Sequence, residues 1–224
     1  FHFFFCDNKQ FLPLVNLQYQ EVEIIVKWGS GVSASTDLKC YGNFVYLDTT
    51  EREAFAQKTM DMMITQVQKI ESTNSETFDI SSLNHPVKTL FWGYQSKSED
   101  VEDDYLTFDG AKIQLNGTDL MPYMTPTYYH TIQGYYGTTN ALINLVDTEN
   151  CPFYTRYYMY SFATDSSDFN NRGTCNFSRL DSAILRINNL QKAPVRTSDT
   201  LNIYALGFNV LRFQSGLAGI LFSN

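Results

Sequence analysis

The chain has 224 residues and a formal net charge of −8, from 16 Lys and Arg against 24 Asp and Glu. An acidic balance without a basic block argues against direct binding of nucleic acid. No uninterrupted run of about 18 apolar residues occurs, so we predict no membrane span. Hydrophobic residues make up 43% and aromatic residues 15% of the chain, which is enough for a substantial core and favours strands over helices.

The first six residues, FHFFFC, form an apolar run without a basic segment ahead of it, so we predict no signal peptide. We interpret the chain as a fragment that begins within a strand. Its cysteines match no CxxC metal pattern and are expected to be reduced thiols, with a disulfide as the open alternative. They are Cys6, Cys40, Cys151 and Cys175.

Two strands are predicted near the start of the chain. Residues 12–28 form the longer one, in which Val22, Ile24, Val26 and Trp28 share one face, and residues 43–48 follow a loop rich in Gly, Ser and Thr. Glu21 and Glu23 share one face of the longer strand, as a general acid–base pair could. No partner site accompanies them, so we expect a solvated face.

One helix is predicted, over about residues 51–70. Thr50 followed by Glu53 has the spacing of a capping box. A stripe of apolar residues then recurs at helical spacing, and a mixed polar face argues against a helix lying on a membrane. The stripe consists of Ala56, Met60, Met63, Ile64 and Val67.

A polar linker over residues 71–84 is the best domain boundary in the sequence. Beyond it, short apolar runs separated by turn residues predict an antiparallel β domain. The predicted strands are residues 87–94, 105–108, 111–115, 141–146, 157–163, 183–187 and 201–224.

Residues 116–140 are predicted to form a long loop rich in Tyr, Pro, Thr and Gly. Aromatic side chains in such a loop can bind sugar or stabilise a protein interface. The candidate contact residues are Tyr123, Tyr128, Tyr129, Tyr135 and Tyr136. The loop opens on the sequon Asn116-Gly117-Thr118, a candidate glycosylation site, whereas Asn176 in a second sequon is interpreted as structural.

No pattern predicts catalysis or a cofactor. The histidines His2, His85 and His130 are isolated, which disfavours a metal site. Gly29-Ser30-Gly31 lacks the Lys and Ser or Thr that complete a phosphate loop. We therefore predict no catalytic residue, no cofactor and no metal.

A weak internal repeat links the two ends of the chain. Leu14, Leu17, Val22 and Ile24 align at a constant offset with Phe177, Leu180, Leu185 and Ile187. Residues 1–48 are therefore interpreted as the final strands of one β domain, residues 49–84 as a helix and linker, and residues 85–224 as a complete second copy.

Several segments, in order along the chain, resemble the major capsid proteins of large nucleocytoplasmic DNA viruses, the phycodnavirus, iridovirus and mimivirus group. They are LPLVNLQYQEV (12–22), YLDTTEREAFA (46–56), HPVK (85–88), IQLNG (113–117), GTCNFSRLD (173–181) and NVLR (209–212). The resemblance implies an all-β fold of antiparallel jelly-roll sandwiches, with the second jelly roll complete and only the end of the first present.

The resemblance also implies a structural virion protein and no enzyme. Its partners would be itself, as a homotrimer that tiles with neighbouring capsomers into an icosahedral shell, and minor capsid or cement proteins. It would be assembled in the host cytoplasm and located in the virion. The alternative is a carbohydrate-binding or glycan-cleaving jelly roll, because that fold also hosts such functions.

Overall fold

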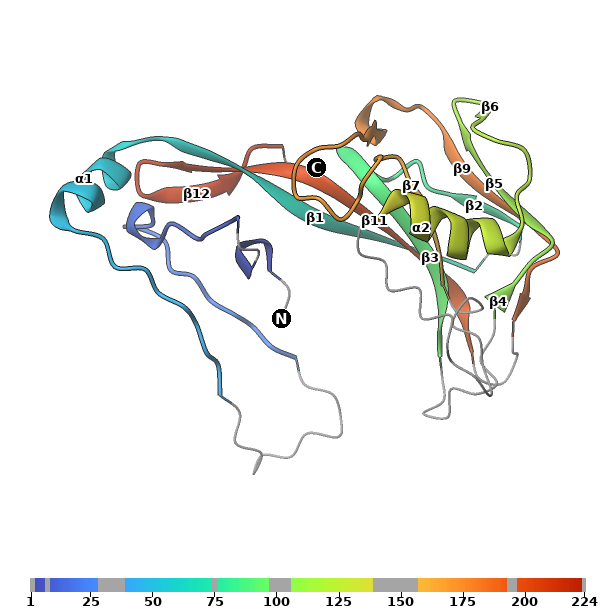
Figure 1. Ribbon diagram of the computed structural model, residues 1–224, viewed down its shortest axis with the longest axis horizontal. Coiled ribbons are helices and arrows are strands. Elements are labelled where there is room, and N and C mark those ends of the chain that lie inside the picture. Colours follow the sequence, from blue (N-terminus) through green and yellow to red (C-terminus); the bar gives the residue numbers. More distant parts are fainter. Residues whose placement is uncertain are drawn as a thin grey trace. The chain divides into compact units, whose positions relative to one another are not determined.

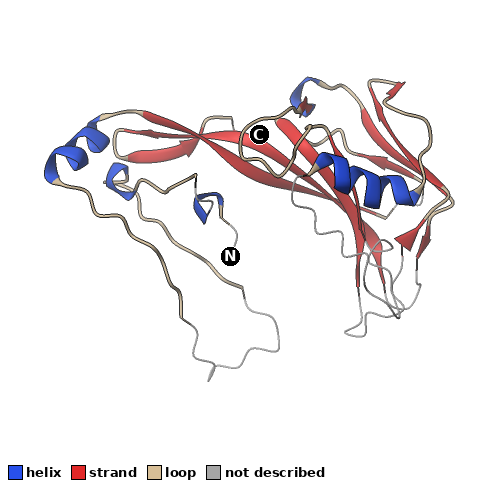
Figure 2. Cartoon of the chain, viewed as in Figure 1, coloured by secondary structure: helices blue, strands red, loops and turns tan. Residues whose placement is uncertain are grey.

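The computed structural model describes residues 3–6, 9–27, 39–73, 76–96, 106–138, 157–192 and 197–222. The chain divides into two compact units, a first unit of residues 1–63 with 210–223 and a sandwich unit of residues 64–209. Strands outnumber helices in the described residues (Figures 1 and 2). In chain order the elements are η1 (Phe4–Cys6), η2 (Leu14–Asn16), α1 (Thr49–Gln57), β1 (Met60–Ser72), β2 (Thr77–Asp79), β3 (Pro86–Ser96), β4 (Leu106–Thr107), β5 (Gly110–Leu115), β6 (Thr118–Asp119), η3 (Tyr128–Ile132), α2 (Gln133–Gly137), β7 (Tyr157–Ser161), β8 (Cys175–Asn176), η5 (Phe177–Arg179), β9 (Ala183–Asn188), β10 (Gln191–Lys192), β11 (Thr197–Gln214) and β12 (Leu217–Ile220).

The sandwich unit is built on two sheets. One has the strand order β1-β11-β3-β7, with β12 and β8 paired to β11 and β3, and the other has the order β2-β9-β5-β6. The pairs β11–β3, β3–β7, β2–β9, β5–β9 and β5–β6 are all antiparallel. The chain thus passes repeatedly between a six-stranded and a four-stranded layer, as in a jelly roll, and β10 and β4 form a separate two-stranded sheet. The predicted antiparallel jelly-roll fold is confirmed.

Period-two alternation explains why β9 buries one of its faces. Ala183, Leu185 and Ile187 are buried, as their shared face predicts. Across the strand pair, Ile113 of β5 lies opposite Leu185. These side chains join one apolar core with residues of the other sheet, including Trp92. The core between the layers therefore follows directly from the alternating sequence.

The helix predicted over residues 51–70 is wrong in its second half. Helix α1 ends at Gln57, and β1 begins at Met60 (Figure 2). In β1, Met62 and Ile64 are buried, whereas Val67, the last member of the predicted apolar stripe, is 61% exposed. A period of two therefore fits this segment better than a period of 3.6. Pairing of β1 with β11 supplies backbone hydrogen bonds across the sheet that a local helix-propensity argument ignores.

The start of α1 also differs from the prediction by two residues. Asp48, and not Thr50, is the N-cap, and its side chain accepts a hydrogen bond from the backbone N–H of Glu51 at 2.8 Å. The Glu51 carboxylate accepts one in return from the Asp48 backbone N–H. This reciprocal pair is a capping box, so the predicted motif exists but uses the preceding Asp.

In the first unit, a buried asparagine holds η2 against the end of α1. The Nδ2 group of Asn16 donates to the carbonyl oxygen of Phe55 at 2.7 Å. The last carbonyls of a helix have no partner within the helix, so this side chain stabilises the C-terminal end of α1. The ring of Phe55 meets that of Phe11 edge to face, with centroids 6.3 Å apart.

The strands predicted at residues 12–28 and 43–48 are not formed in this structure. Over its described part, the first segment contains η2 followed by residues without regular structure, and residues 43–48 form no strand. Strands require partners for their backbone groups. Many apolar side chains of these segments are exposed, among them Val22, Ile24, Ile25, Phe44, Val45 and Tyr46.

Two further segments differ from the sequence-based prediction. Within the predicted linker, β2 pairs with β9, and its Phe78 is fully buried. The sandwich therefore includes residues that the sequence places between two domains. Within the predicted loop 116–140, the described residues contain β6, η3 and α2. The predicted strand at residues 141–146 and Cys151 lie outside the described residues.

Candidate interaction surface

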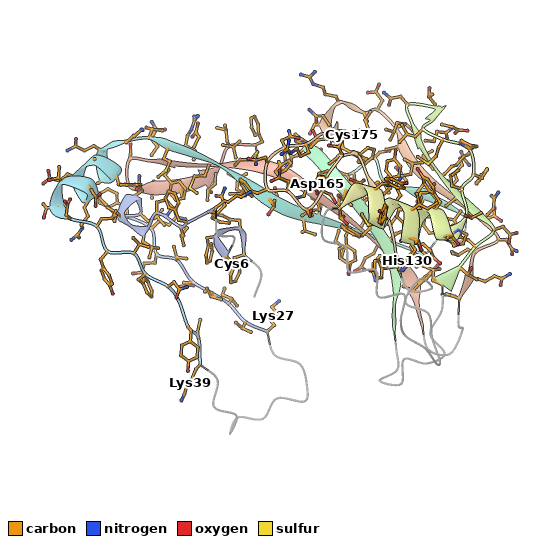
Figure 3. The ribbon with its side chains drawn as sticks, in the orientation of Figure 1. Cys6, Lys27, Lys39, His130, Asp165 and Cys175 are labelled. Carbon is orange, nitrogen blue, oxygen red and sulfur yellow. The ribbon has the colours of Figure 1, made fainter. Side chains whose placement is uncertain are left out.

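The described residues contain no group of three or more His, Cys, Asp or Glu side chains that could hold a metal ion. Cys6, Cys40 and Cys175 are free thiols, and burial raises the pKa of Cys175. Figure 3 labels Cys6 and Cys175. Over the same residues, no helix is long and apolar enough to cross a membrane. The tyrosine-rich segment is the candidate contact surface that the sequence predicts, and most of it lies within the described residues.

The structure separates the five candidate tyrosines into two groups. Tyr129 is completely buried, and its hydroxyl donates to the carbonyl oxygen of Ala111 at 2.8 Å. Burial raises the pKa of Tyr129. Tyr128 is half-buried, packs against the core and accepts a hydrogen bond from Gln133 at 2.8 Å. These two residues support the fold and do not offer a contact surface.

The other group is exposed. Tyr135 is 68% exposed and Tyr136 is 74% exposed, and Ile132 beside them is 43% exposed. The rings of Tyr135 and Tyr136 meet edge to face with centroids 5.0 Å apart. Tyr123 is also exposed, but it lies over β5, with the Lys112 ammonium 4.8 Å from its ring centroid. We call Ile132, Tyr135 and Tyr136 the tyrosine face.

The neighbouring sandwich positions the tyrosine face. The side-chain oxygen of Gln133 accepts a hydrogen bond from the backbone N–H of Ser161 on β7, at 3.0 Å. The carbonyl oxygen of Gly137 accepts one from the hydroxyl of Ser166 at 2.8 Å. A β-carbon on Gly137 would lie 2.7 Å from that of Ser161, so the close approach of α2 to β7 requires glycine there. The helical stretch is therefore held by side chains at both ends.

His130 joins the same stretch to β7 and is labelled in Figure 3. Its Nδ1 lies 3.0 Å from the carbonyl oxygen of Tyr157. A carbonyl can only accept, so Nδ1 carries the proton and donates. Burial lowers the pKa of His130, and the hydrogen bond to Tyr157 opposes part of that effect. The neutral imidazole is the form that the fold favours.

This environment predicts a pH dependence of stability. The pKa of His130 is lower in the folded chain than its ordinary value of 6.5. The neutral side chain therefore stabilises the fold fully above pH 6.5, and this stabilisation is lost as the pH falls through the folded pKa. We expect a lower urea midpoint at about pH 5 than at about pH 7.5, and a smaller difference in His130→Asn. The Asn amide can replace the Nδ1 donor but does not titrate. An identical pH dependence in the variant would contradict this role.

Asn116, the candidate glycosylation site, lies at the turn between β5 and β6. Its backbone φ of 48° and that of Gly117, 78°, lie in the left-handed region that a tight hairpin turn requires. Its Oδ1 accepts hydrogen bonds from the backbone N–H groups of Asp181 and Ser182, at 2.9 and 3.1 Å. Glycosylation of this exposed side chain stays a prediction. In the other sequon, the Oδ1 of Asn176 caps η5 by accepting from the Ser178 backbone N–H.

Replacing Asn116 with alanine is expected to lower the free energy of unfolding by about 1–2 kcal/mol, because two hydrogen bonds are lost and alanine tolerates positive φ poorly. Asn116→Asp keeps the acceptor oxygen and the backbone preference, so it should retain most of the stability. Urea unfolding of both variants measures the difference. Equal losses in the two variants would show that the Oδ1 contacts contribute nothing.

Comparison with known proteins places this sandwich in a family. Residues 51–219 match the family described as large eukaryotic DNA virus major capsid protein. The chain belongs to that family. The match begins in α1 and ends in β12, so it includes every strand of the sandwich unit described above.

Curated members of the family match nearly the whole chain. The major capsid protein of Pyramimonas orientalis virus is 35% identical over 242 residues, which cover 99% of this chain and 60% of that protein. The major capsid protein of Paramecium bursaria Chlorella virus 1 is 28% identical, over 95% of this chain and 63% of that protein. The chain thus spans about three fifths of the length of these relatives.

Solved structures agree with the fold. The PBCV-1 virus capsid protein superimposes with a TM-score of 0.63 and 26% identity, over 80% of this chain and 55% of that one. The Faustovirus major capsid protein superimposes with a TM-score of 0.54 over 75% of this chain. At 12% identity, this second likeness supports the fold alone.

The sequence-based analysis did not identify Ile132 as a surface residue. The sequence signal for it is weak: Ile132, Tyr135 and Tyr136 have the i, i+3, i+4 spacing of a regular helical face, but Ile132 belongs to the π-helical stretch η3, which departs from that period. The glycines at 134 and 137 and the density of tyrosine obscure that pattern, since both favour a loop interpretation.

Proposed function

We propose that this chain is a shell-building part of a major capsid protein of a large eukaryotic DNA virus, located in the virion after assembly in the host cytoplasm. Its work would consist of folding and self-association, without catalysis. The observation that carries the proposal is the jelly-roll sandwich, which superimposes on the PBCV-1 virus capsid protein at 26% identity within the matched family.

The internal repeat supports a second sandwich in the whole protein. The 3₁₀ turn η2 occupies the repeat positions of η5, and the two turns share a hydrogen bond: the backbone N–H of Leu17 donates to Leu14, as that of Leu180 donates to Phe177. In the same alignment, residues 20–25 correspond to β9. We propose that residues 20–25 and 43–48 are strands of a first jelly roll.

The exposed apolar residues of these two segments support the same proposal. Strand β9 is flanked by β2 and β5, which cover its backbone and share its core. Among the described residues, no strand pairs with residues 20–25, and Ile24 and Ile25 remain exposed. Since the chain spans about three fifths of its relatives' length, we propose that further strands of the whole protein pair with these segments.

Two similar sandwiches in each protomer would give a trimer six similar lobes and therefore a pseudo-hexagonal outline. Such capsomers could tile an icosahedral shell through repeated contacts between copies, with minor capsid or cement proteins as further partners. Specific assemblies of this kind need interfaces of about 800 Å² per partner or more.

The carbohydrate-binding alternative gains no support from the site. The rings of Tyr135 and Tyr136 lie at 86° to one another and do not form a flat stacking platform. No Asp or Glu occurs between Leu120 and Thr138, so no paired carboxylates accompany them in that segment. Glu21 and Glu23 belong to the first unit.

Native mass spectrometry of the protein isolated from virus particles tests the proposed function. A trimer of the whole protein is the expected species, and it should persist on dilution if the subunit contacts are extensive. A stable monomer would contradict the proposal and return a binding module to consideration.

A further inference from the structure

We propose that the β11–β12 hairpin, residues 211–220, holds the start of the strand proposed for residues 20–25 and so forms part of the first jelly roll. The inference rests on the proposed function, because it takes residues 20–25 as a strand of that domain. It deepens the proposal by naming the segment of this chain that fixes the strand. Residues 20–25 and the hairpin both belong to the first unit.

The first observation is a pair of hydrogen bonds between the hairpin and the chain at the start of residues 20–25. The backbone N–H of Tyr19 donates to the carbonyl oxygen of Gly216 at 3.0 Å. The backbone N–H of Ala218 donates to Oε1 of Gln20 at 2.9 Å. In Figure 1 this early part of the chain, in blue, runs beside β12. The chain therefore supplies β12 with partners of the kind that a neighbouring strand would offer.

The second observation is that the tip of the hairpin is shaped for this contact. Ser215 and Gly216 form a two-residue turn with φ of 53° and 80°, both in the left-handed region. Gly216 is buried, although it lies in a turn. A β-carbon there would lie 2.5 Å from Cδ2 of Tyr19 and 3.3 Å from the β-carbon of Gln18. The ring of Tyr19 therefore covers the turn so closely that only glycine fits.

The third observation is a turn of the same geometry at the corresponding place in the sandwich. Asn116 and Gly117 join β5 to β6 with φ of 48° and 78°. The backbone N–H of Ser182, directly before β9, donates to Oδ1 of Asn116 at 3.1 Å. The carbonyl oxygen of Ser182 accepts from the backbone N–H of Asn116 at 2.7 Å. The constant offset of the internal repeat aligns Tyr19 with Ser182.

In both units, a tight turn thus meets the residue that leads into the repeated strand. In the sandwich the turn comes from β5 and β6, which belong to the same sheet as β9. In the first unit it comes from a hairpin almost two hundred residues later in the sequence. The β11–β12 hairpin therefore has toward residues 20–25 the role that the β5–β6 turn has toward β9. Because β11 also lies between β1 and β3 in the sandwich, one strand serves both jelly rolls.

Further contacts fix the two partners before residues 20–25 pair with other strands. Upstream of Tyr19, the side chain of Asn16 is bound to the end of α1 through the carbonyl oxygen of Phe55. On the hairpin, Nε and Nη2 of Arg212 donate to the two carboxylate oxygens of Asp61 in β1, each at 2.7 Å. Residues 16–20 are therefore held at both ends. A segment that is already held loses less conformational freedom when further strands pair with it.

A disulfide crosslink in the whole protein tests the contact. The β-carbon of Gln18 lies 3.3 Å from the position of a β-carbon at residue 216, close to the separation that a disulfide spans. Gln18→Cys with Gly216→Cys is expected to form an intramolecular disulfide under mild oxidation. Gln18→Cys with Gly219→Cys is the matched control, because a β-carbon at residue 219 of β12 meets nothing within 4 Å. Mass spectrometry of the peptides distinguishes the new bond from any bond of the native cysteines.

Hydrogen exchange in the whole protein measures whether the hairpin holds the strand. Gly216→Ala is expected to speed exchange of the backbone amides of residues 19–25 by about tenfold or more, because the methyl group displaces Tyr19 and alanine tolerates positive φ poorly. Gly117→Ala is the control, since its turn has nearly the same φ and its β-carbon meets nothing within 4 Å. This control should leave the exchange of residues 19–25 unchanged.

The outcomes separate this inference from the proposed function. If the unaltered protein forms trimers but position 18 crosslinks no better to position 216 than to position 219, the role of the hairpin is overturned and the capsid function stands. The same holds if Gly216→Ala leaves the exchange of residues 19–25 unchanged. If the unaltered protein does not associate with itself at all, both are overturned. Preferential crosslinking at position 216 together with faster exchange in Gly216→Ala supports the inference.

Discussion

Replacing Tyr129 with alanine is expected to lower the free energy of unfolding of the sandwich by about 3–5 kcal/mol. The side chain is completely buried, and its ring meets that of Trp92 edge to face with centroids 5.0 Å apart. Its hydroxyl satisfies the carbonyl oxygen of Ala111 in the core. Alanine would leave a cavity in this aromatic cluster and would remove one of the two hydrogen bonds that the Ala111 carbonyl accepts, the other coming from the backbone N–H of Met124.

Urea unfolding followed by tryptophan fluorescence measures this loss, because Trp92 is the direct neighbour of Tyr129. Tyr136→Ala is the matched control, with the same chemical change at an exposed position. Tyr129→Phe removes only the hydroxyl and should cost about 0.5–1.5 kcal/mol, because the Ala111 carbonyl keeps its hydrogen bond from the Met124 backbone N–H. A loss at Tyr129→Ala no greater than that at Tyr136→Ala would contradict the assignment of Tyr129 to the core.

The second large effect is expected at Gly207. A β-carbon there would lie 2.5 Å from the carbonyl oxygen of Pro86 and 3.2 Å from the α-carbon of Val87. Both atoms belong to the backbone of β3 and cannot rotate away. The pairing of β11 with β3 shifts register between Leu206 and Gly207, so the bulge brings the two strands unusually close at this point.

Gly207→Ala is therefore expected to destabilise the fold by about 1–3 kcal/mol, because the strands must separate to admit a methyl group. Gly134→Ala is the control, since a β-carbon at that helical position meets nothing within 4 Å and should be neutral or stabilising. Thermal unfolding of both variants distinguishes them. An unchanged midpoint for Gly207→Ala would mean that the bulge adapts at little cost.

The strands of the sandwich could be predicted from the sequence where one face of the strand is buried and apolar. In β9, Ala183, Leu185 and Ile187 recur at a period of two and are buried, and this period specifies both the strand and its inward side. The same pattern is present in residues 20–25, but the strand is not formed there. Alternation specifies which side of a strand is apolar, whereas pairing depends on neighbours that lie elsewhere in the chain.

The methionine-rich stretch after residue 59 accounts for the incorrect second half of the predicted helix. Methionine favours a helix by intrinsic propensity, and Met60 and Met63 belong to a stripe with Ala56, Ile64 and Val67 that suits a period of 3.6. Whether residues 60–72 form a helix or a strand depends on β11, which lies more than a hundred residues later in the sequence and pairs with β1. Local propensity cannot report such a partner, and tertiary pairing prevailed.

The tyrosine-rich segment was identified as a candidate surface, but its buried and exposed residues could not be separated. Tyr128, Tyr129, Tyr135 and Tyr136 have the same chemistry, and a π-helical stretch, η3, sets which of them point inward. A π-helix changes the angular spacing of its residues, so the usual helical periodicity does not apply across it. Only the folded chain shows that Tyr129 lies in the core while Tyr136 is exposed.

A cryo-electron microscopy reconstruction of virus particles that contain this protein tests the proposed function most directly. The proposal predicts shell density made of trimeric capsomers in which the sandwich of β1-β11-β3-β7 and β2-β9-β5-β6 can be fitted once per protomer. It also predicts a second, similar sandwich beside it, with strands at residues 20–25 and 43–48. A shell built from a subunit of another fold, with this chain absent from it, would contradict the proposed function.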